Sequence, residues 1–352
     1  MTTINYASFP HIVERILEFA DKDVLHSFRS TCSKIRFLAD KRLVEHIAVG
    51  YACCCTEVLT YSHPHIGLRV HGARIPCLPW EYKRRCGTHF AADGETWYWA
   101  PPKMLRHVRI VDVGHDITPF MMESTRYFLR GAEVMRHFNH DEFYPAGGLY
   151  PFIRAKKLIH FLLCIPETDD TYVSPVTVPY GVKHFVVTVP FAQGGRDVNE
   201  IKYERARPDG THRVKTVTII YRPNKYRRDH PQPEIKDTVL GLESVLRQCA
   251  AELGSVTYTF VGLDEYLESH SLTPIAGPGT IHERHHRAIV NRIKEEVRKL
   301  GTYDESLFDA KVYTHAQYLE KVGSHQYDLE TCPDWEEFGF RECSWKVQPA
   351  DS

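Results

Sequence analysis

Apolar residues between positions 9 and 47 recur every three to four residues, with charged residues between them. This period places the apolar side chains on one face of each of three short amphipathic helices. The first helix is expected to open at Phe9-Pro10, because proline lacks an N–H and suits a first helical turn. Asp23 is a suitable N-cap for the second helix, and the third is expected to continue to Ile47. The pattern therefore predicts a small helical module within residues 1–50.

Beyond residue 103 the pattern changes to short apolar runs rich in Val, Ile, Leu, Phe and Thr. The runs lie at 108–113, 158–163, 182–189, 214–221 and 256–261. Near-continuous apolar runs are expected of parallel strands that are covered on both faces. Helical patterns are found at 118–134, 237–253, 280–300 and 316–322, whereas the proline-rich stretches 166–179 and 223–233 indicate loops. Strands that alternate with helices predict an α/β layer with right-handed connections.

Two arrangements of these strands remain open. Several strands follow a basic lead-in, such as Ala155-Lys156-Lys157, and successive strands begin at intervals that overlap those of solenoid repeats. This resembles a degenerate leucine-rich repeat, but an irregular, open and mostly parallel sheet explains the same runs. Between the helical module and this domain, residues 51–102 are expected to connect the two with short strands. The α/β domain is expected at residues 103–333, followed by a tail at 334–352.

Composition narrows the classes of function. The chain has 352 residues and a formal net charge of −1, whereas a dedicated nucleic-acid binder would usually be basic. One dense basic run, at 222–228, is short and broken by proline, so we interpret it as a solvated loop. No apolar run approaches the roughly 20 residues that span a bilayer, and no secretory signal precedes the first helix. We therefore expect no membrane or nucleic-acid partner, and a cytoplasmic or nuclear protein whose 10 cysteines are reduced.

Two groups of metal-ligating residue types need an interpretation. Cys86 and His89 have the spacing of a zinc ligand pair, but no second pair accompanies them. His282, Glu283 and His286 match the motif H-E-x-x-H. On a helix, the two histidines of this motif lie on one face and can bind one zinc ion, and the glutamate acts as general base. A third protein ligand is not evident, and charged residues surround the motif. We therefore expect an exposed, charged helix and no cofactor, and keep a zinc-dependent hydrolase at these residues as the alternative function.

The order of residues in the helical module resembles an F-box, in the degenerate form found in fungal proteins. The positions that carry the resemblance are Phe9-Pro10, Ile12-Val13, Ile16-Leu17, Asp23-Val24-Leu25, Thr31-Cys32-Ser33-Lys34-Ile35 and Leu38-Ala39. The sequence departs from the family pattern at Phe9, Thr31 and Ile35, of which the last stands where a tryptophan is usual. The resemblance covers about a tenth of the chain.

This resemblance implies a role in ubiquitin ligation. F-box modules dock on a Skp-type adaptor of a cullin–RING ligase through apolar residues of their helices. Carried over to this sequence, the adaptor-binding residues would be Pro10, Ile16, Leu17, Val24, Leu25 and Cys32. The chain would then be a non-catalytic subunit whose α/β domain recruits a protein substrate by protein–protein interaction.

Overall fold

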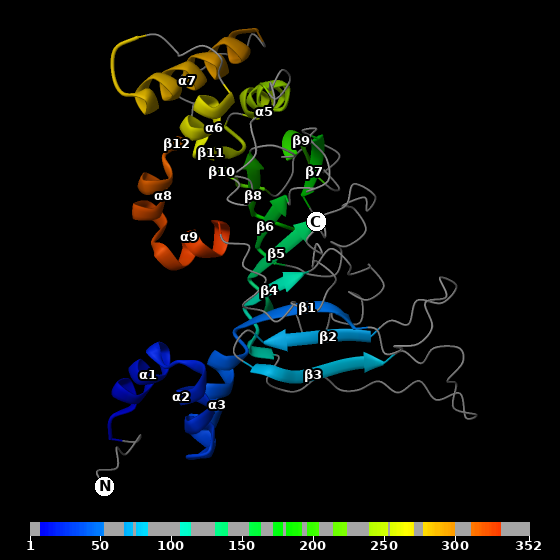
Figure 1. The fold of residues 1–352 in the computed structure, drawn as a ribbon, viewed down its shortest axis with the longest axis vertical. Coiled ribbons are helices and arrows are strands. Elements are labelled where there is room, and N and C mark those ends of the chain that lie inside the picture. The colour runs from blue at the N-terminus through cyan, green and yellow to red at the C-terminus, as the bar shows by residue number, and fades with distance from the viewer. Residues whose placement is uncertain are drawn as a thin grey trace, which may run out of the picture. The chain divides into compact units, whose positions relative to one another are not determined.

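The computed structural model places most of the regular structure of the chain in two compact units. It describes residues 8–52, 67–72, 75–83, 106–113, 131–139, 155–162, 172–178, 181–191, 196–203, 214–223, 239–252, 254–270, 277–299 and 311–331. The first unit contains residues 1–133 and 334–352, and the second contains residues 134–333 (Figure 1). None of the described helices is long and apolar enough to cross a membrane.

The first unit begins with the three expected helices, α1 (Pro10–Phe19), α2 (Lys22–Arg29) and α3 (Ser33–Leu43). Pro10 occupies the first helical turn, as predicted. The cap of α2 is Asp21 and not Asp23: its side chain accepts a hydrogen bond from the Val24 N–H at 2.8 Å. Asp23 lies within the first turn of α2, where its negative charge is favoured by the positive end of the helix dipole. The core of the module is apolar and consists of Val13, Leu17, Leu25, Ile35, Ala39 and Leu43.

The strands of the first unit are β1 (His46–Ala52), β2 (Gly67–Gly72), β3 (Ile75–Lys83) and β4 (Ile110–Val113). β1 pairs with β4 in parallel and with β2 antiparallel, and β3 adds to the far side of β2. The expectation that the third helix reaches Ile47 is wrong, because α3 ends at Leu43 and Ile47 is buried within β1. Asp112 of β4 is fully buried, and its Oδ1 lies 2.9 Å from Nε2 of His46, which supplies the partner that a buried carboxylate requires.

The second unit is built on a parallel sheet whose strands follow one another in chain order. The order is β5 (Val134–Asn139), β6 (Lys157–Leu162), β8 (His184–Phe191), β10 (Thr216–Pro223), β11 (Thr257–Val261) and β12 (Lys311–Tyr313), and each neighbouring pair is parallel (Figure 1). The predicted α/β class is therefore confirmed. The strands described here advance in one direction, as in a solenoid. They do not reverse at a switch point, where doubly wound sheets bind their ligands.

The segments that connect these strands include a second small sheet and three helices. β7 (Tyr172–Val178) and β9 (Arg196–Tyr203) form a second parallel sheet, against which α5 (Val239–Ala251) packs through Gln248 and Glu252. α6 (Leu263–His270) places Tyr266 against Tyr221, with ring centroids 4.4 Å apart. α7 (Ile281–Lys299) follows and buries Ile289, Ile293 and Val297.

The opposite face of the sheet is covered by α8 (His315–Val322) and α9 (Ser324–Thr331). Thr188 of β8 is in register with Ile220, so its side chain lies on the face of the sheet opposite to Tyr221. Its hydroxyl donates a hydrogen bond to the Glu330 carbonyl of α9 at 2.7 Å. The Glu330 carboxylate accepts hydrogen bonds from Lys157 Nζ and from Tyr318 Oη, the latter at 2.6 Å. Figure 1 shows α8 and α9 on one side of the strands and β7 and β9 on the other.

Two elements of the second unit differ from expectation. The helix predicted through residue 134 is wrong at its end, because Val134 opens strand β5. Arg136 and His137 interrupt the apolar pattern of this strand, yet both are buried: the guanidinium lies over the ring of Phe138, and His137 Nδ1 lies 3.0 Å from Nδ1 of His160. The proline-rich stretch predicted as a loop contains β7, in which Pro175 follows a register shift, a position where proline is tolerated in a strand.

Candidate functional site

The first helix carries more apolar surface than its own module can cover. Val13 and Leu17 point into the core and are 4% and 2% exposed. Ile12, Ile16 and Phe19 lie at i, i+4 and i+7 on the neighbouring row of the helix and are 41%, 39% and 72% exposed. Helix α1 therefore presents two adjacent apolar rows, one of which the module leaves open.

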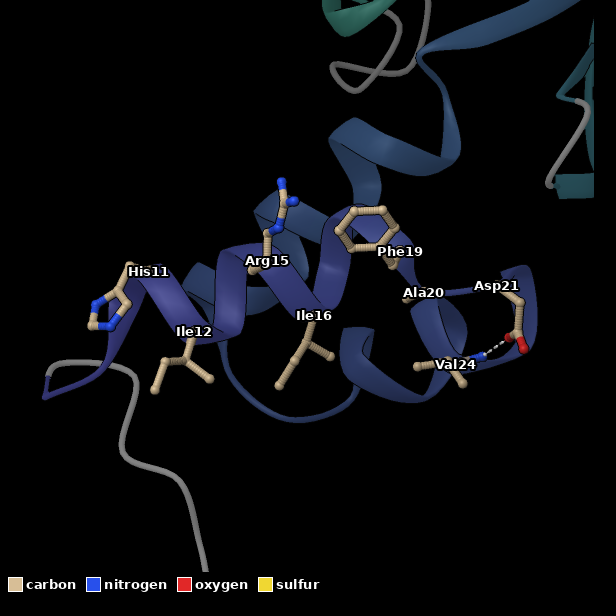
Figure 2. A pocket seen from close by; sticks show the side chains of 8 residues that line it. All are labelled: His11, Ile12, Arg15, Ile16, Phe19, Ala20, Asp21 and Val24. Atoms are coloured by element: carbon tan, nitrogen blue, oxygen red, sulfur yellow. Dashed lines mark hydrogen bonds between the residues drawn. The ribbon is translucent and has the colours of Figure 1, made fainter. Parts of the chain in front are cut away.

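The open row continues onto α2 and lines a hollow. Val24, at the start of α2, is 39% exposed and belongs to the same surface. We call Ile12, Ile16, Phe19 and Val24 the apolar row. Together with His11, Arg15, Ala20 and Asp21, they line a hollow of about 770 Å³ (Figure 2). Figure 2 shows Ile12 and Ile16 side by side on α1, with Val24 following on α2.

The charged groups at this hollow are already engaged within the module. Arg15 donates to Glu18 at 2.7 Å, and its guanidinium lies 4.5 Å from the centre of the Phe19 ring. Asp21 is occupied by the cap of α2. The hollow therefore offers a partner apolar contact and few unsatisfied charges, which is the composition of the core of a protein–protein interface.

The module does not depend on the apolar row for its own packing. Arg29 pairs with Asp40 at 2.5 Å and so joins α2 to α3, and Arg42 donates to the Glu18 carbonyl at 2.9 Å and joins α3 to α1. Ile35, where the F-box pattern has tryptophan, is buried at 8% exposure within the core. This departure therefore falls inside the core of the module, whereas those at Phe9 and Thr31 are at exposed positions.

The six predicted adaptor contacts do not all reach the surface. Ile16 and Val24 line the hollow, and Pro10 and Cys32 are exposed outside it. Leu17 and Leu25 are only 2% and 0% exposed, because they fill the core between the helices. A partner cannot reach these two side chains without opening the module, so we remove them from the contact set.

Ile12 and Phe19 belong to the open surface although neither is among the six adaptor contacts predicted from the sequence. Their signal is the helical phase: with Ile16 they form a row that is separate from the row of Val13 and Leu17. An apolar stripe wider than one core-facing row indicates that part of it remains open.

The H-E-x-x-H residues lie at the start of α7, where the glutamate has a structural role. The Thr280 N–H donates to Glu283 Oε2 at 2.7 Å, and the Glu283 N–H donates to Thr280 Oγ1 at 3.2 Å. This reciprocal pair is a capping box, which satisfies two backbone donors at the helix start. His286 lines a shallow hollow of about 720 Å³ beside Val312 and Tyr313. Within the described part of the chain, no group of three or more His, Cys, Asp or Glu side chains could hold a metal ion, and the side chain of His282 lies outside that part.

The other candidate groups are only partly described. Cys86 and His89 lie outside the described residues, as do residues 224–228 of the basic run. Arg222, the first residue of the basic run, lies within the described residues. Its guanidinium donates a hydrogen bond to the Thr331 carbonyl at the end of α9. This arginine therefore holds the C-terminal helices on the sheet.

The fold and this surface define a class of protein: a small helical module with an open apolar row, joined to an α/β unit whose strands advance in chain order. No protein-family model matches the chain, and no match is found among curated proteins or among solved structures.

Proposed function

We propose that the chain is an F-box-like substrate adaptor of a Skp–cullin–F-box ubiquitin ligase, and that its helical module docks on the Skp-type adaptor through the apolar row. The observation that carries this proposal is the exposure of Ile12, Ile16, Phe19 and Val24 on a module whose core is complete without them. The F-box resemblance supplies the kind of partner, since that family binds its adaptor through apolar residues of the same helices. The proposal keeps the expected cytoplasmic or nuclear location.

The size of the row is adequate for a docking site. Full burial of a large apolar side chain contributes about 1.5–3 kcal/mol. Ile12, Ile16 and Val24 are each about 40% exposed, so covering one of them would contribute about 1 kcal/mol. Phe19, at 72% exposure, would contribute about 2 kcal/mol. The row can therefore supply about 5 kcal/mol before the costs of association.

In this proposal the second unit recruits the substrate. The strands of its parallel sheet, β5, β6, β8, β10, β11 and β12, follow one another in chain order, so none of these neighbouring pairs forms a switch point of the kind at which doubly wound sheets hold nucleotides. A broad surface on such a unit suits a protein substrate, as the concave and convex faces of solenoids do.

The zinc-dependent hydrolase has less support. Its general base would be Glu283, yet that carboxylate accepts the Thr280 N–H and holds the start of α7. A hydrolase would require this bond to break before the carboxylate could act on a metal-bound water.

Co-purification of the full chain with a Skp-type adaptor tests the proposal. The informative variant is Ile16→Asp combined with Val24→Asp, which places two charges in the apolar row. The matched control is Leu319→Asp, because Leu319 of α8 is 38% exposed and Ile16 and Val24 are each 39% exposed. We expect the wild-type chain and the control to retain the adaptor at one-to-one stoichiometry and the double variant to lose it.

Thermal unfolding of the same proteins separates loss of binding from loss of folding. The double variant should unfold within a few degrees of the wild type, because Ile16 and Val24 are each 39% exposed and lie outside the buried core of the module. A core variant, Leu17→Ala, should instead lower stability by about 2–5 kcal/mol. Adaptor retention by the double variant, or no retention by the folded wild type, would refute the proposal.

A further inference from the structure

Three neighbouring strands of the second unit begin in the same way. Before each of β6, β8 and β10, a buried apolar residue is followed by an exposed lysine and then by the first residue of the strand. The buried residues are Ala155, Val182 and Val214, and the lysines are Lys156, Lys183 and Lys215. The basic lead-ins noted in the sequence are therefore equivalent positions of one structural repeat.

The register of the strands brings these lysines into one row. Lys157, His184 and Thr216 are direct partners across the strands, so the residues before them are also aligned. The Lys183 N–H donates to the Lys156 carbonyl at 2.8 Å, and the Lys215 N–H donates to the Lys183 carbonyl at 2.7 Å. Adjacent strands lie about 4.8 Å apart, so the row is about 10 Å long. We call Lys156, Lys183 and Lys215 the lysine ladder.

The positive charge of the lysine ladder is not compensated by the residues that the structure describes. In that part of the chain, none of its three ammonium groups has an ion pair or a side-chain hydrogen bond. The neighbouring Lys157 differs, because its ammonium is bound by Glu330 of α9. The pKa of His184 is lowered, first by burial and then by the positive charges of Lys157, Lys215 and Lys183. The row therefore carries three aligned positive charges, and the acidic residue that borders it, Glu133 before β5, is paired with Arg109.

We propose that the lysine ladder binds an acidic α-helix of a partner protein. Side chains three or four residues apart on a helix have Cβ atoms about 5–6 Å apart, and positions i and i+7 are separated by about 10.5 Å along the axis. These spacings match the ladder. An extended peptide would place alternate side chains about 6.8 Å apart, and the third about 13.5 Å from the first.

One lysine of this sheet, outside the ladder, is already paired with a carboxylate on a helix. Glu330 is carried by a helix, and it reaches Lys157, which directly follows the first lysine of the ladder. A nucleic acid is the less suitable partner, because the net charge of the chain is −1 and no Phe, Tyr or Trp adjoins the three lysines in the sequence for base stacking. The binding surface does not depend on the proposed function. If the chain is a ubiquitin-ligase subunit, the acidic helix would belong to its protein substrate, and that step alone rests on the proposed function.

Fluorescence anisotropy with the full chain tests the inference. The probe is a labelled helical peptide of alanine and glutamine with glutamates at i, i+4 and i+7. A second peptide has the same composition with its glutamates distributed around the helix. The ladder variant is Lys156→Ala, Lys183→Ala and Lys215→Ala. The control variant replaces three other exposed lysines, Lys202, Lys299 and Lys321, by alanine, and so changes the net charge equally.

We expect the first peptide to bind the wild type and the control variant, to bind the ladder variant about 10-fold more weakly, and to lose affinity as salt rises. Peptide binding should also raise the pKa of His184, measured by NMR, because added carboxylates offset the lysine charges. Equal losses in the two variants, or equal binding of the second peptide, would overturn the inference. Tighter binding of a single-stranded oligonucleotide through the same lysines would also overturn it.

The two proposals fail separately in these experiments. Adaptor retention by the ladder variant should be unchanged, since its lysines lie in the second unit and the apolar row lies in the first. A chain that binds the acidic peptide but no adaptor would refute the proposed function and leave the acidic-helix surface in place.

Discussion

Replacement of Glu330 by alanine tests how α8 and α9 are held on the sheet of the second unit. The carboxylate is 1% exposed and receives three donors: Lys157 Nζ, Tyr318 Oη at 2.6 Å and Gln326 Nε2 at 2.7 Å. Burial, followed by the charge of Glu330, raises the pKa of Tyr318, so the hydroxyl stays protonated and donates to the carboxylate.

The expected loss is large because the partners remain behind. Breaking a buried ion pair by removing one member costs about 3–5 kcal/mol, since the other charge is left without compensation. Lys157 is 21% exposed, so its ammonium can partly reach water, and we expect a loss of about 3 kcal/mol for Glu330→Ala. Glu330→Gln keeps a side chain that can accept from Tyr318 and should lose about half as much.

Urea unfolding at neutral pH, followed by circular dichroism, measures this loss. The control is Glu320→Gln, an exposed carboxylate on α8, which should change the free energy of unfolding by less than about 0.5 kcal/mol. A double variant with Lys157→Ala completes a mutant cycle, whose coupling energy should exceed about 1 kcal/mol. If Glu330→Ala unfolds at the same urea concentration as Glu320→Gln, the carboxylate does not hold these helices and the reasoning fails.

Three further outcomes follow from single positions. Gly262 has φ +69°, and an added Cβ would lie 2.4 Å from the Tyr221 carbonyl oxygen, so Gly262→Ala should lower stability by about 2 kcal/mol or more in thermal unfolding. Replacing Glu283 by alanine removes half of the capping box with Thr280 and should cost about 1 kcal/mol, with no change in bound metal by elemental analysis. The pKa of His184 lies below its ordinary value of 6.5, chiefly through burial, so the unfolded chain binds the proton more readily and stability should fall as pH drops below about 6.5. A His184→Asn variant should lose less stability than the wild type between about pH 7.5 and about pH 5.5.

The sequence predicts those strands whose apolar pattern follows directly from burial of both faces. The runs that form β6, β8, β10 and β11 are covered on both faces, so most of their residues are apolar and buried. The pattern does not predict strand β5, because two of its buried residues, Arg136 and His137, are polar. His137 lies against His160 of β6, and Arg136 lies over the rings of Phe138 in its own strand and Phe161 of β6, so part of the compensation comes from a neighbouring strand that a local pattern does not contain.

The docking surface could be predicted only in part for a related reason. A helical stripe shows which residues are apolar, but not which of two adjacent rows the other helices cover. Leu17 and Leu25 are in the core because α3 packs on that side, whereas Ile12 and Phe19 remain open. The lysine ladder was visible in the sequence only as separate basic lead-ins, since the alignment of Lys156 with Lys183 depends on strand register.

The apolar row and the lysine ladder share one property that neither core packing nor solubility explains. An exposed isoleucine pair and an exposed phenylalanine on a short helix gain nothing from water, and three aligned lysines on adjacent strands repel one another. The two proposals give each arrangement a complementary partner, an apolar surface for the row in the first unit and a row of carboxylates for the ladder in the second. Because the proposed partners differ in chemistry and the two surfaces lie in separate compact units, the proposals would let one chain bind both partners. That is the physical requirement for a subunit that joins an enzyme to its substrate.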